Sequence, residues 1–420
     1  MKLDSHDVVV VGGGPGGFGA AVAAARSGAK TLLIEREGCL GGGATTMLVN
    51  PFMPYTTDVW QASGPHKLVN GGLFTEVRRR LVARKAVNPA DDRRFDDEAL
   101  KVILDEIATE SGVEIIFHAA MFDAQAAGGR VQSVRLAHNS GPMTAGGKVF
   151  VDATGDALLA QQAGCRIMLG DAEGKVMPMT LNFMVAGVDT ANMPSGREIV
   201  AMAADGGKDT PALVNTNVNC ISMPRVGVVH FNAIRISGST LDAADLSRAE
   251  IEGRRRVENF VAWLRARIPA FANCWLCKTA NHIGIRESRR VVGDYVLTGD
   301  DWKRCARFDD AIACSSYPVD IHGNQPGMTD LRFLPEGEYY QVPYRCLTPA
   351  GAANLLMASR SISADVVAHA SLRTIPTVMN IGEAAGYAAA MSLAGGDVRS
   401  IDVRKLQDRI RLFGGILEPK

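Results

Sequence analysis

The fold of this chain is decided by residues 7–36, DVVVVGGGPGGFGAAVAAARSGAKTLLIER. Val8–Val11 predict a buried parallel strand, because an unbroken run of valines offers both faces of a strand to a core. Gly12, Gly14 and Gly17 follow with the spacing G-x-G-x-x-G. The first glycine permits a tight turn, the second lets the backbone approach a pyrophosphate, and the third lets the next helix pack closely on the sheet. The stretch therefore predicts a dinucleotide-binding unit.

The rest of the same stretch favours that prediction over a glycine-rich turn in an unrelated α/β domain. Pro15 and Gly16 open a small-residue helix, whose N-terminal N–H groups can bind phosphates. Lys30–Ile34 predict the second strand. Glu35 ends that strand, where an acid binds the ribose hydroxyls of an adenosine, and Arg36 follows it.

The composition is that of an ordinary globular protein. Of 420 residues, 47% are hydrophobic and 21% charged, and Lys+Arg and Asp+Glu both number 45, so the formal net charge is zero. This balance favours neither nucleic acid nor an anionic membrane as partner. No apolar run approaches the roughly 20 residues of a membrane span, and the polar start, MKLDSHD, does not resemble a signal peptide. With 8 scattered cysteines, we expect a cytoplasmic enzyme whose thiols are mostly reduced.

The pattern of the sequence changes twice along the chain. Residues 96–117 predict a helix followed by a strand, which continues the α/β pattern. Beyond about 170, strand-like runs surround a charged helix, Asp242–Ile268. A small-residue helix near 376–394 returns to the first pattern. We therefore predict an α/β architecture: a Rossmann-like dinucleotide-binding domain with a small antiparallel β insertion, made of residues 1–169 and 341–420, and an inserted α+β substrate lobe, residues 170–340.

Further motifs lie along nearly the whole chain. They are GGGAT (41–45), ATGD (153–156), RESRRVVGDYVLTGDD (286–301), YPVDIHG (317–323), YYQVPYRCL (339–347), NLLMASRSIS (354–363), AHASLR (368–373) and IGEAAGYAAA (381–390). Together with the first stretch, they resemble flavin-dependent oxidoreductases of the glutathione-reductase-fold superfamily, and more narrowly the broad FAD-dependent oxidoreductase family. The resemblance implies FAD as cofactor. It implies no particular substrate, because one fold hosts many chemistries.

The resemblance also implies which residues surround FAD. The glycine loop 41–45 would run beside the pyrophosphate and the flavin ring, since its backbone carries almost no side chains. The stretch at Ala120 and Met121 would face the adenine, and the turn 153–156 would cover the adenosine half unless it is an ordinary turn. The family usually has Gly where this chain has Ser359, before Arg360. The implied contacts are Gly42, Gly43, Ala44, Thr45, Met121, Ala153, Thr154, Gly155, Asp156 and Arg360.

The small-residue helix near the C-terminus is expected to act on the flavin. Pro376 suits a first helical turn, and Gly382, Ala384 and Ala385 leave one face nearly bare of side chains. By family resemblance, the helix N-terminus would point at the pyrimidine edge of the flavin, where its dipole would stabilise the charge of the reduced ring. The alternative is that these small residues only allow tight packing.

Four residues are predicted to act on the substrate: His369, Arg373, His322 and Tyr344. An imidazole at His369 could accept a proton as hydride leaves a C–H bond, and the guanidinium of Arg373 could hold a substrate oxygen. We expect His322 and Tyr344 to approach from the inserted lobe. For each histidine the alternative is a buried structural residue. Arg286 and Glu287 would either face the same cleft or form an ion-pair network between the lobes.

Other cofactors find little support in the sequence. Cys274 and Cys277 form a C-x-x-C pair, but no second pair follows at a zinc-site spacing, so we expect two buried thiols and no metal. Cys39 stands alone after the second strand, which disfavours the paired-cysteine chemistry of disulfide reductases. No second strand–glycine–helix fingerprint for a nicotinamide follows residue 100.

We therefore expect an FAD-dependent oxidoreductase that transfers a hydride from a small polar organic substrate to flavin N5, as a dehydrogenase or oxidase. A reductase of an activated double bond stays open. So does a non-catalytic electron-transfer subunit, which would have a shallow flavin face and no polar cluster around His322 and His369. An NAD-dependent dehydrogenase would leave the GEAAG helix unexplained. The electron acceptor is open between dioxygen, a quinone, a nicotinamide and a carrier protein, and a homo-oligomer also stays open.

Overall fold

The largest sheet of the protein is mainly parallel and carries the predicted strand–turn–helix. The computed structural model describes residues 2–3, 5–57, 66–205, 218–323 and 329–419. The sheet has the order β5–β2–β1–β8–β7–β6, and β19 also pairs with β8. Its strands are β1 (His6–Val11), β2 (Thr31–Ile34), β5 (Glu114–Ile116), β6 (Ala120–Ala127), β7 (Arg130–Ala137), β8 (Met143–Asp152) and β19 (Leu355–Met357). The predicted Rossmann-like α/β fold is confirmed.

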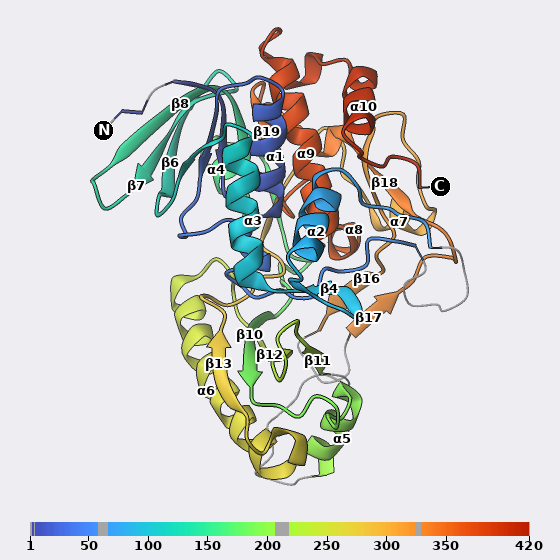
Figure 1. The fold of residues 1–420 in the computed structure, drawn as a ribbon. Coiled ribbons are helices and arrows are strands. Elements are labelled where there is room, and N and C mark those ends of the chain that lie inside the picture. Colours follow the sequence, from blue (N-terminus) through green and yellow to red (C-terminus); the bar gives the residue numbers. More distant parts are fainter. Residues whose placement is uncertain (1, 4, 58–65, 206–217, 324–328, 420) are drawn as a thin grey trace.

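Strand β8 belongs to two kinds of sheet at once. Its second half pairs in parallel with β1, up to Val11 opposite Asp152, and with β19. Its first half pairs antiparallel with β7, from Leu136 opposite Met143 to Ser133 opposite Gly146. The hairpin β6–β7 therefore extends from the parallel core as the predicted antiparallel insertion, at the left of Figure 1.

Helices α1 (Pro15–Arg26) and α9 (Ile375–Ser392) lie side by side against this sheet (Figure 1). Their backbones touch through glycines. A Cβ added at Gly382 would lie 1.9 Å from the carbonyl oxygen of Gly16, and one at Gly386 would lie 2.2 Å from that of Ala20. The contact brings residues from distant parts of the chain, α1 and α9, together.

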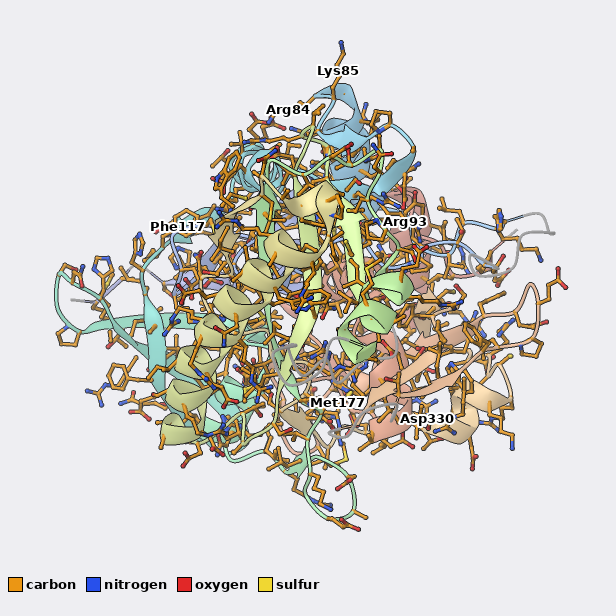
Figure 2. All side chains as sticks on the ribbon, turned by 90° about the horizontal axis from the view of Figure 1, so that it is seen from below. Arg84, Lys85, Arg93, Phe117, Met177 and Asp330 are labelled. Carbon is orange, nitrogen blue, oxygen red and sulfur yellow. The ribbon has the colours of Figure 1, made fainter. Side chains whose placement is uncertain are left out.

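A second body with its own hydrophobic core lies below the first in Figure 1. Its sheet has the order β11 (Asn219–Ser222), β12 (Val229–Ile236), β10 (Met179–Ala186) and β13 (Trp275–Thr279). The rings of Phe183 and Phe231 stack with their centroids 5.0 Å apart, and the ring of Phe260 on α6 (Ala243–Arg267) packs edge-on against both. Figure 2, seen from this side, shows α6 lying across the sheet. We call this body the substrate lobe.

The core of the substrate lobe is shorter than the predicted segment 170–340. The second hydrophobic cluster consists of Leu48 and residues between 179 and 283, whereas Val291, Trp302 and Tyr340 belong to the first cluster. After residue 285 the chain returns to the main body, because β14 (Arg289–Val291) pairs with β9 (Ile167–Leu169) and β15 (Ala311–Ser315) packs on α9.

The remaining elements complete the two bodies and the region between them. They are η1 (Gly42–Ala44), α2 (Leu73–Ala83), β3 (Val87–Asn88), β4 (Asp91–Phe95), α3 (Asp97–Glu110), α4 (Leu158–Gln162), α5 (Gly196–Asp205), η3 (Pro269–Phe271), α7 (Gly299–Lys303), β16 (Val319–His322), β17 (Thr329–Arg332), β18 (Tyr340–Pro343), η4 (Tyr344–Cys346), α8 (Val366–Leu372), η5 (Val398–Ser400) and α10 (Val403–Leu412). No helix among the described residues is long and apolar enough to cross a membrane.

Candidate active site

A cavity of about 390 Å³ is lined by both bodies of the molecule. The main body contributes the glycine turn after β1, the end of β2 and the turn after β8. The substrate lobe contributes residues of β10 and β12. The loop after η1 and the start of α9 line the cavity as well. A molecule in this cavity would therefore contact elements from both ends of the chain and from the inserted lobe.

The glycine turn leaves an open cradle at the start of α1. Gly12 has a φ of +101°, and a Cβ there would lie 2.4 Å from the carbonyl oxygen of Ala153. Gly14 lines the cavity, and a Cβ on it would meet nothing within 4 Å. Helix α1 has no side-chain cap and no acidic residue in its first turn. Its first N–H groups therefore stay free for an anion, which the helix dipole favours.

Glu35 is held rigidly at the end of β2. Its carboxylate is 6% exposed and lines the cavity. The backbone N–H of Gly13 donates to Oε2 at 2.5 Å, and that of Glu37 donates to Oε1 at 2.8 Å. The carboxylate is thus fixed beside the glycine turn as an acceptor for ligand hydroxyls.

An ion pair and hydrogen bonds connect the turn after β8 with residues that follow the substrate lobe in the sequence. Asp156 pairs with Arg360 at 2.9 Å and accepts a hydrogen bond from the Ser288 hydroxyl at 2.5 Å. Arg289 donates from Nε to the carbonyl oxygen of Asp156 at 3.0 Å. The Nε of Arg360 is buried and has no partner among the residues that the structure describes. Arg360 therefore has an unused donor beside the cavity that it lines.

A set of polar side chains, which we call the polar pocket, lines the cavity where the two bodies meet. Its members are Thr180, Asn232, Arg286, Tyr317, Asp320, His322 and Arg373. The guanidinium of Arg286 donates to the carbonyl oxygen of Pro178 at 2.7 Å and to the Thr180 hydroxyl at 2.6 Å. Arg373 donates to the carbonyl oxygen of Asp320 at 3.0 Å. The Tyr317 hydroxyl donates to the Asp320 carboxylate at 3.4 Å.

His322 has both ring nitrogens engaged. Arg235 lies 2.7 Å from Nδ1, and because a guanidinium only donates, Nδ1 must accept. Nε2 therefore carries the proton and faces Asp320 at 3.2 Å. Burial and the charge of Arg286 lower the pKa of His322 to about 3, so the ring is neutral. His322 lines the cavity as predicted, but it orients Asp320 and has no free nitrogen for a substrate proton.

A comparison with protein families identifies the family of this chain. A model of the family described as FAD dependent oxidoreductase matches residues 7–410. The chain belongs to this family. FAD is therefore the cofactor of this protein.

Individual relatives resemble the chain only over short stretches or at low identity. Dihydrolipoyl dehydrogenase 2, mitochondrial, of Arabidopsis thaliana is 59% identical over 39 residues, which are 9% of this chain and 8% of that protein. Fumarate reductase (cytochrome) of Shewanella frigidimarina is 58% identical over 41 residues, 10% of this chain and 7% of that protein.

Two solved structures resemble the whole chain weakly. A geranylgeranyl bacteriochlorophyll reductase-like protein from Thermoplasma acidophilum has a TM-score of 0.49 at 14% identity, over 99% of this chain and 85% of that one. A flavin-dependent brominase has a TM-score of 0.48 at 13% identity, over 96% of this chain and 83% of that one. None of these similarities identifies the reaction of this chain.

The residues of the cavity fit FAD. The bare positions Gly14 and Gly43 leave room for it, since a Cβ at either would meet nothing within 4 Å. The start of α1 would face its phosphates, Glu35 its ribose, and the unused donor of Arg360 another of its polar groups. When bound, FAD supplies a two-electron acceptor and donor for hydride chemistry.

Most of the predicted cofactor residues line the cavity. They are Gly12, Gly14, Pro15, Gly16, Glu35, Arg36, Gly42, Gly43, Met121, Ala153, Thr154, Gly155, Asp156 and Arg360. Gly17, Ala44 and Thr45 do not line it. Gly17 packs against the turn instead, where a Cβ would lie 1.7 Å from the Gly12 carbonyl oxygen, and Thr45 donates to the carbonyl oxygen of Leu40 at 2.8 Å.

The structure corrects the interpretation of helix α9. Its first turn does line the cavity, through Thr374, Ile375 and Val378. Gly382, Ala384 and Ala385 do not, because they lie one or more turns further along. Gly382 faces the backbone of α1, so its lack of a side chain allows helix packing rather than a flavin contact.

The structure places two of the predicted catalytic residues, His369 and Tyr344, away from the lining of the cavity. His369 lies on α8, is 1% exposed, and has an Nδ1 without a partner among the described residues. Burial, together with nearby Arg290, holds the pKa of its imidazole well below the usual value. Tyr344 donates its hydroxyl to the carbonyl oxygen of Val398 at 2.6 Å, inside the main body. Arg373 does line the cavity.

Several cavity residues were not among the predicted catalytic set. Tyr317 and Asp320 stand in the same motif as His322, and only the histidine was chosen. Asn182 on β10 and Asn232 on β12 also line the cavity. Their signal was available in the sequence, since each is an amide in a strand made mainly of apolar residues. A buried polar side chain in a strand needs a partner or a ligand.

Residues of the RESRR motif take both roles that the sequence left open, one in the cavity and one in an ion pair. Arg286 lines the cavity, whereas Glu287 forms a buried ion pair with Arg290 and accepts from the backbone N–H of Met177 at 3.1 Å. The Cys pair differs from its prediction, because Cys274 is buried but Cys277 is exposed. Among the described residues, no group of three or more His, Cys, Asp or Glu is arranged to hold a metal ion.

Proposed function

We propose that the protein is a dehydrogenase or oxidase of a small polar organic molecule, for which bound FAD supplies the hydride acceptor at flavin N5. The observation that supports this most is a single cavity whose walls include both the dinucleotide cradle and the polar pocket. Cofactor and substrate would thereby share one enclosed space, as direct hydride transfer requires.

The chain's residues have distinct tasks in this reaction. Arg286 and Arg373 would hold substrate oxygens by charge-assisted hydrogen bonds. The substrate C–H bond breaks with its electron pair, so the substrate loses two electrons, and the proton of its O–H or N–H group must leave separately. The hydrogen-bonded pair Tyr317 and Asp320 lines the cavity and offers that proton a route.

The first turn of α9 would support the same direction of transfer. Thr374, Ile375 and Val378 line the cavity, so the positive end of the helix dipole lies at its wall. A positive potential there stabilises negative charge that develops on a ligand as it accepts a hydride.

Two alternatives share parts of this reasoning. Reduction of an activated double bond would use the same residues in the opposite direction. A non-catalytic electron-transfer subunit is less well supported, because it would not need buried arginines, a tyrosine and a carboxylate around the cavity. We propose dioxygen, a quinone, a nicotinamide or a carrier protein as the reoxidant.

The test begins with the visible spectrum of the purified protein and release of its chromophore by acid or heat. Released FAD supports the proposal, and a protein that is colourless and takes up no added FAD contradicts it. Anaerobic addition of small alcohols, amines and hydroxy acids should then bleach the flavin band. Arg286→Gln should slow the bleaching, whereas Arg332→Gln, an exposed arginine outside the cavity, should not. Reoxidation of dithionite-reduced flavin by an activated alkene, with no small molecule that bleaches the oxidised flavin, would favour the reductase.

A further inference from the structure

The polar pocket contains more positive than negative charge. Arg286 and Arg373 line it, and Arg235 lies directly behind His322. Among the described members of the polar pocket, Asp320 is the one carboxylate. His322 is neutral and therefore adds no charge to the pocket. The pocket therefore carries an excess of cations.

Arg286 makes hydrogen bonds only with neutral groups among the described residues. Its hydrogen bonds go to neutral oxygens, those of Pro178, Thr180 and, at 3.4 Å, Asn232. Burial, and then the charges of Arg373 and Arg235, lower the pKa of Arg286 to about 9. A partly buried cation with only neutral partners is destabilising, and an anion that binds beside it offsets that cost.

Arg373 is also incompletely paired. It reaches the Asp320 carboxylate only at 3.8 Å, and its Nε is buried without a partner among the described residues. The Asp320 carboxylate is shared with His322 and Tyr317. Although burial alone would raise the pKa of Asp320, its hydrogen bond with His322 and the charges of Arg373 and Arg286 hold it well below the usual value. Asp320 is therefore already committed and cannot neutralise both arginines.

We propose that the substrate of this site is a carboxylate anion, bound through its carboxylate group by Arg286 and Arg373. This rests on the proposed function, because it names the substrate class of that same cavity. A guanidinium presents a planar pair of donors that matches a carboxylate in bidentate geometry. The uncapped N-terminus of α1 would bind the cofactor phosphates, so the arginines of the polar pocket remain for the substrate.

The bound anion also prepares the pocket for proton transfer. Asp320 and His322 are weak bases in the substrate-free pocket because cations surround them. A carboxylate between Arg286 and Arg373 offsets those cations and raises the proton affinity of Asp320.

The experiment is calorimetric titration of the FAD-loaded protein with malonate and with malonamide, its neutral counterpart. Malonate should bind at least about 10-fold more tightly. Arg286→Gln and Arg373→Gln should each weaken malonate binding by about 10-fold or more, Arg286→Lys should weaken it less, and Arg332→Gln should leave it unchanged.

The outcomes separate this inference from the proposed function. Equal binding of malonate and malonamide, with FAD retained, overturns the carboxylate site and leaves the FAD enzyme standing. Malonate binding that depends on Arg286 in a protein that never takes up FAD keeps the anion site and removes the proposed function. Arginine variants that lose FAD but bind malonate normally would assign the guanidinium groups to the cofactor and overturn the inference.

Discussion

Glu35 is the residue on which the cofactor end of the cavity depends most. Glu35→Gln should weaken FAD binding by about 10-fold, because an amide accepts ribose hydroxyl hydrogen bonds less strongly than a carboxylate. The glutamine can still accept one of the two backbone hydrogen bonds that hold Glu35. The measurement is the FAD dissociation constant, with the exposed Glu338→Gln as control. Unchanged affinity would remove Glu35 from the FAD site.

His369 should prove structural. His369→Ala removes a fully buried ring and leaves a void, so we expect a loss of about 2 kcal/mol in the free energy of unfolding. The rate of flavin reduction per folded molecule should remain near that of the wild type, since His369 does not line the cavity. Urea unfolding and anaerobic flavin bleaching measure the two effects. A bleaching rate reduced 100-fold at unchanged stability would return His369 to the reaction.

At the scale of elements, one kind of glycine allows α1 and α9 to pack, and another kind leaves room in the cavity. Gly382→Ala places a methyl group 1.9 Å from a backbone oxygen, so it should destabilise the FAD-free protein by about 3 kcal/mol or more. Gly43→Ala points its methyl group into open space at the cavity wall, so it should leave the FAD-free protein stable and weaken FAD binding. Thermal unfolding and FAD titration of both variants test this. Equal stability of the two FAD-free variants would contradict the packing role of Gly382.

A buried acid links α9 to the start of α2. Glu383 accepts hydrogen bonds from the backbone N–H of Leu73 and from the Tyr387 hydroxyl, both at 3.1 Å. Burial raises its pKa to about 7, from an ordinary value of 4.5. The folded state therefore holds a proton that the unfolded state has already released between these pH values, so stability falls as the pH rises from 4.5 to 7.

The Glu383→Gln variant should lose that pH dependence. The wild type should lose roughly 3 kcal/mol more than the variant between pH 4.5 and 7, because the amide cannot ionise. Urea unfolding of both proteins at pH 5 and pH 8 measures the difference, with Glu338→Gln as the exposed control. Parallel stability curves would show that Glu383 is not the titrating group.

At the scale of the whole molecule, the loop after η1 connects the two bodies. Asn182 of the substrate lobe donates to the carbonyl oxygen of Met47 at 2.8 Å, and His230 lies 2.7 Å from that of Leu48. Because this loop also lines the cavity, FAD should stabilise both bodies together. Calorimetry should show one transition whose Tm rises with FAD, by about 3 kcal/mol of added stability at 100 times the dissociation constant.

Asn182→Ala should reduce that stabilisation, because the loop then loses its hydrogen bond to β10. An FAD effect confined to one of two separate transitions would contradict the coupling of the bodies through the loop.

The parts of the molecule that were predictable are those in which local sequence carries the reason. The strand, turn and helix of residues 7–36 need only local periodicity and glycine conformation, and they form as predicted. The charged helix Asp242–Ile268 forms as Ala243–Arg267, with the two predicted end residues as its caps. Glu35 reaches the cavity because its position follows from a strand that ends there.

The active-site residues were harder to predict because their environment is assembled from distant segments. Arg286 and Glu287 are neighbours in sequence, yet one lines the cavity and the other is paired in the core. His369 and Arg373 lie four residues apart, and only the second reaches the cavity. Which side of a segment faces a ligand depends on what packs on the other side, and that contact is absent from the local sequence.

The amino-acid sequence alone was enough to predict the dinucleotide-binding fold and FAD as its cofactor, since these follow from short-range patterns of glycine, apolar and acidic residues. The membership of the polar pocket depends instead on tertiary packing. In the folded chain α9 packs on α1, His369 and Tyr344 lie away from the cavity, and Arg235, Arg286 and Arg373 lie around Asp320. Burial and the charges of neighbours give those groups their chemistry, and both exist only once the chain has folded.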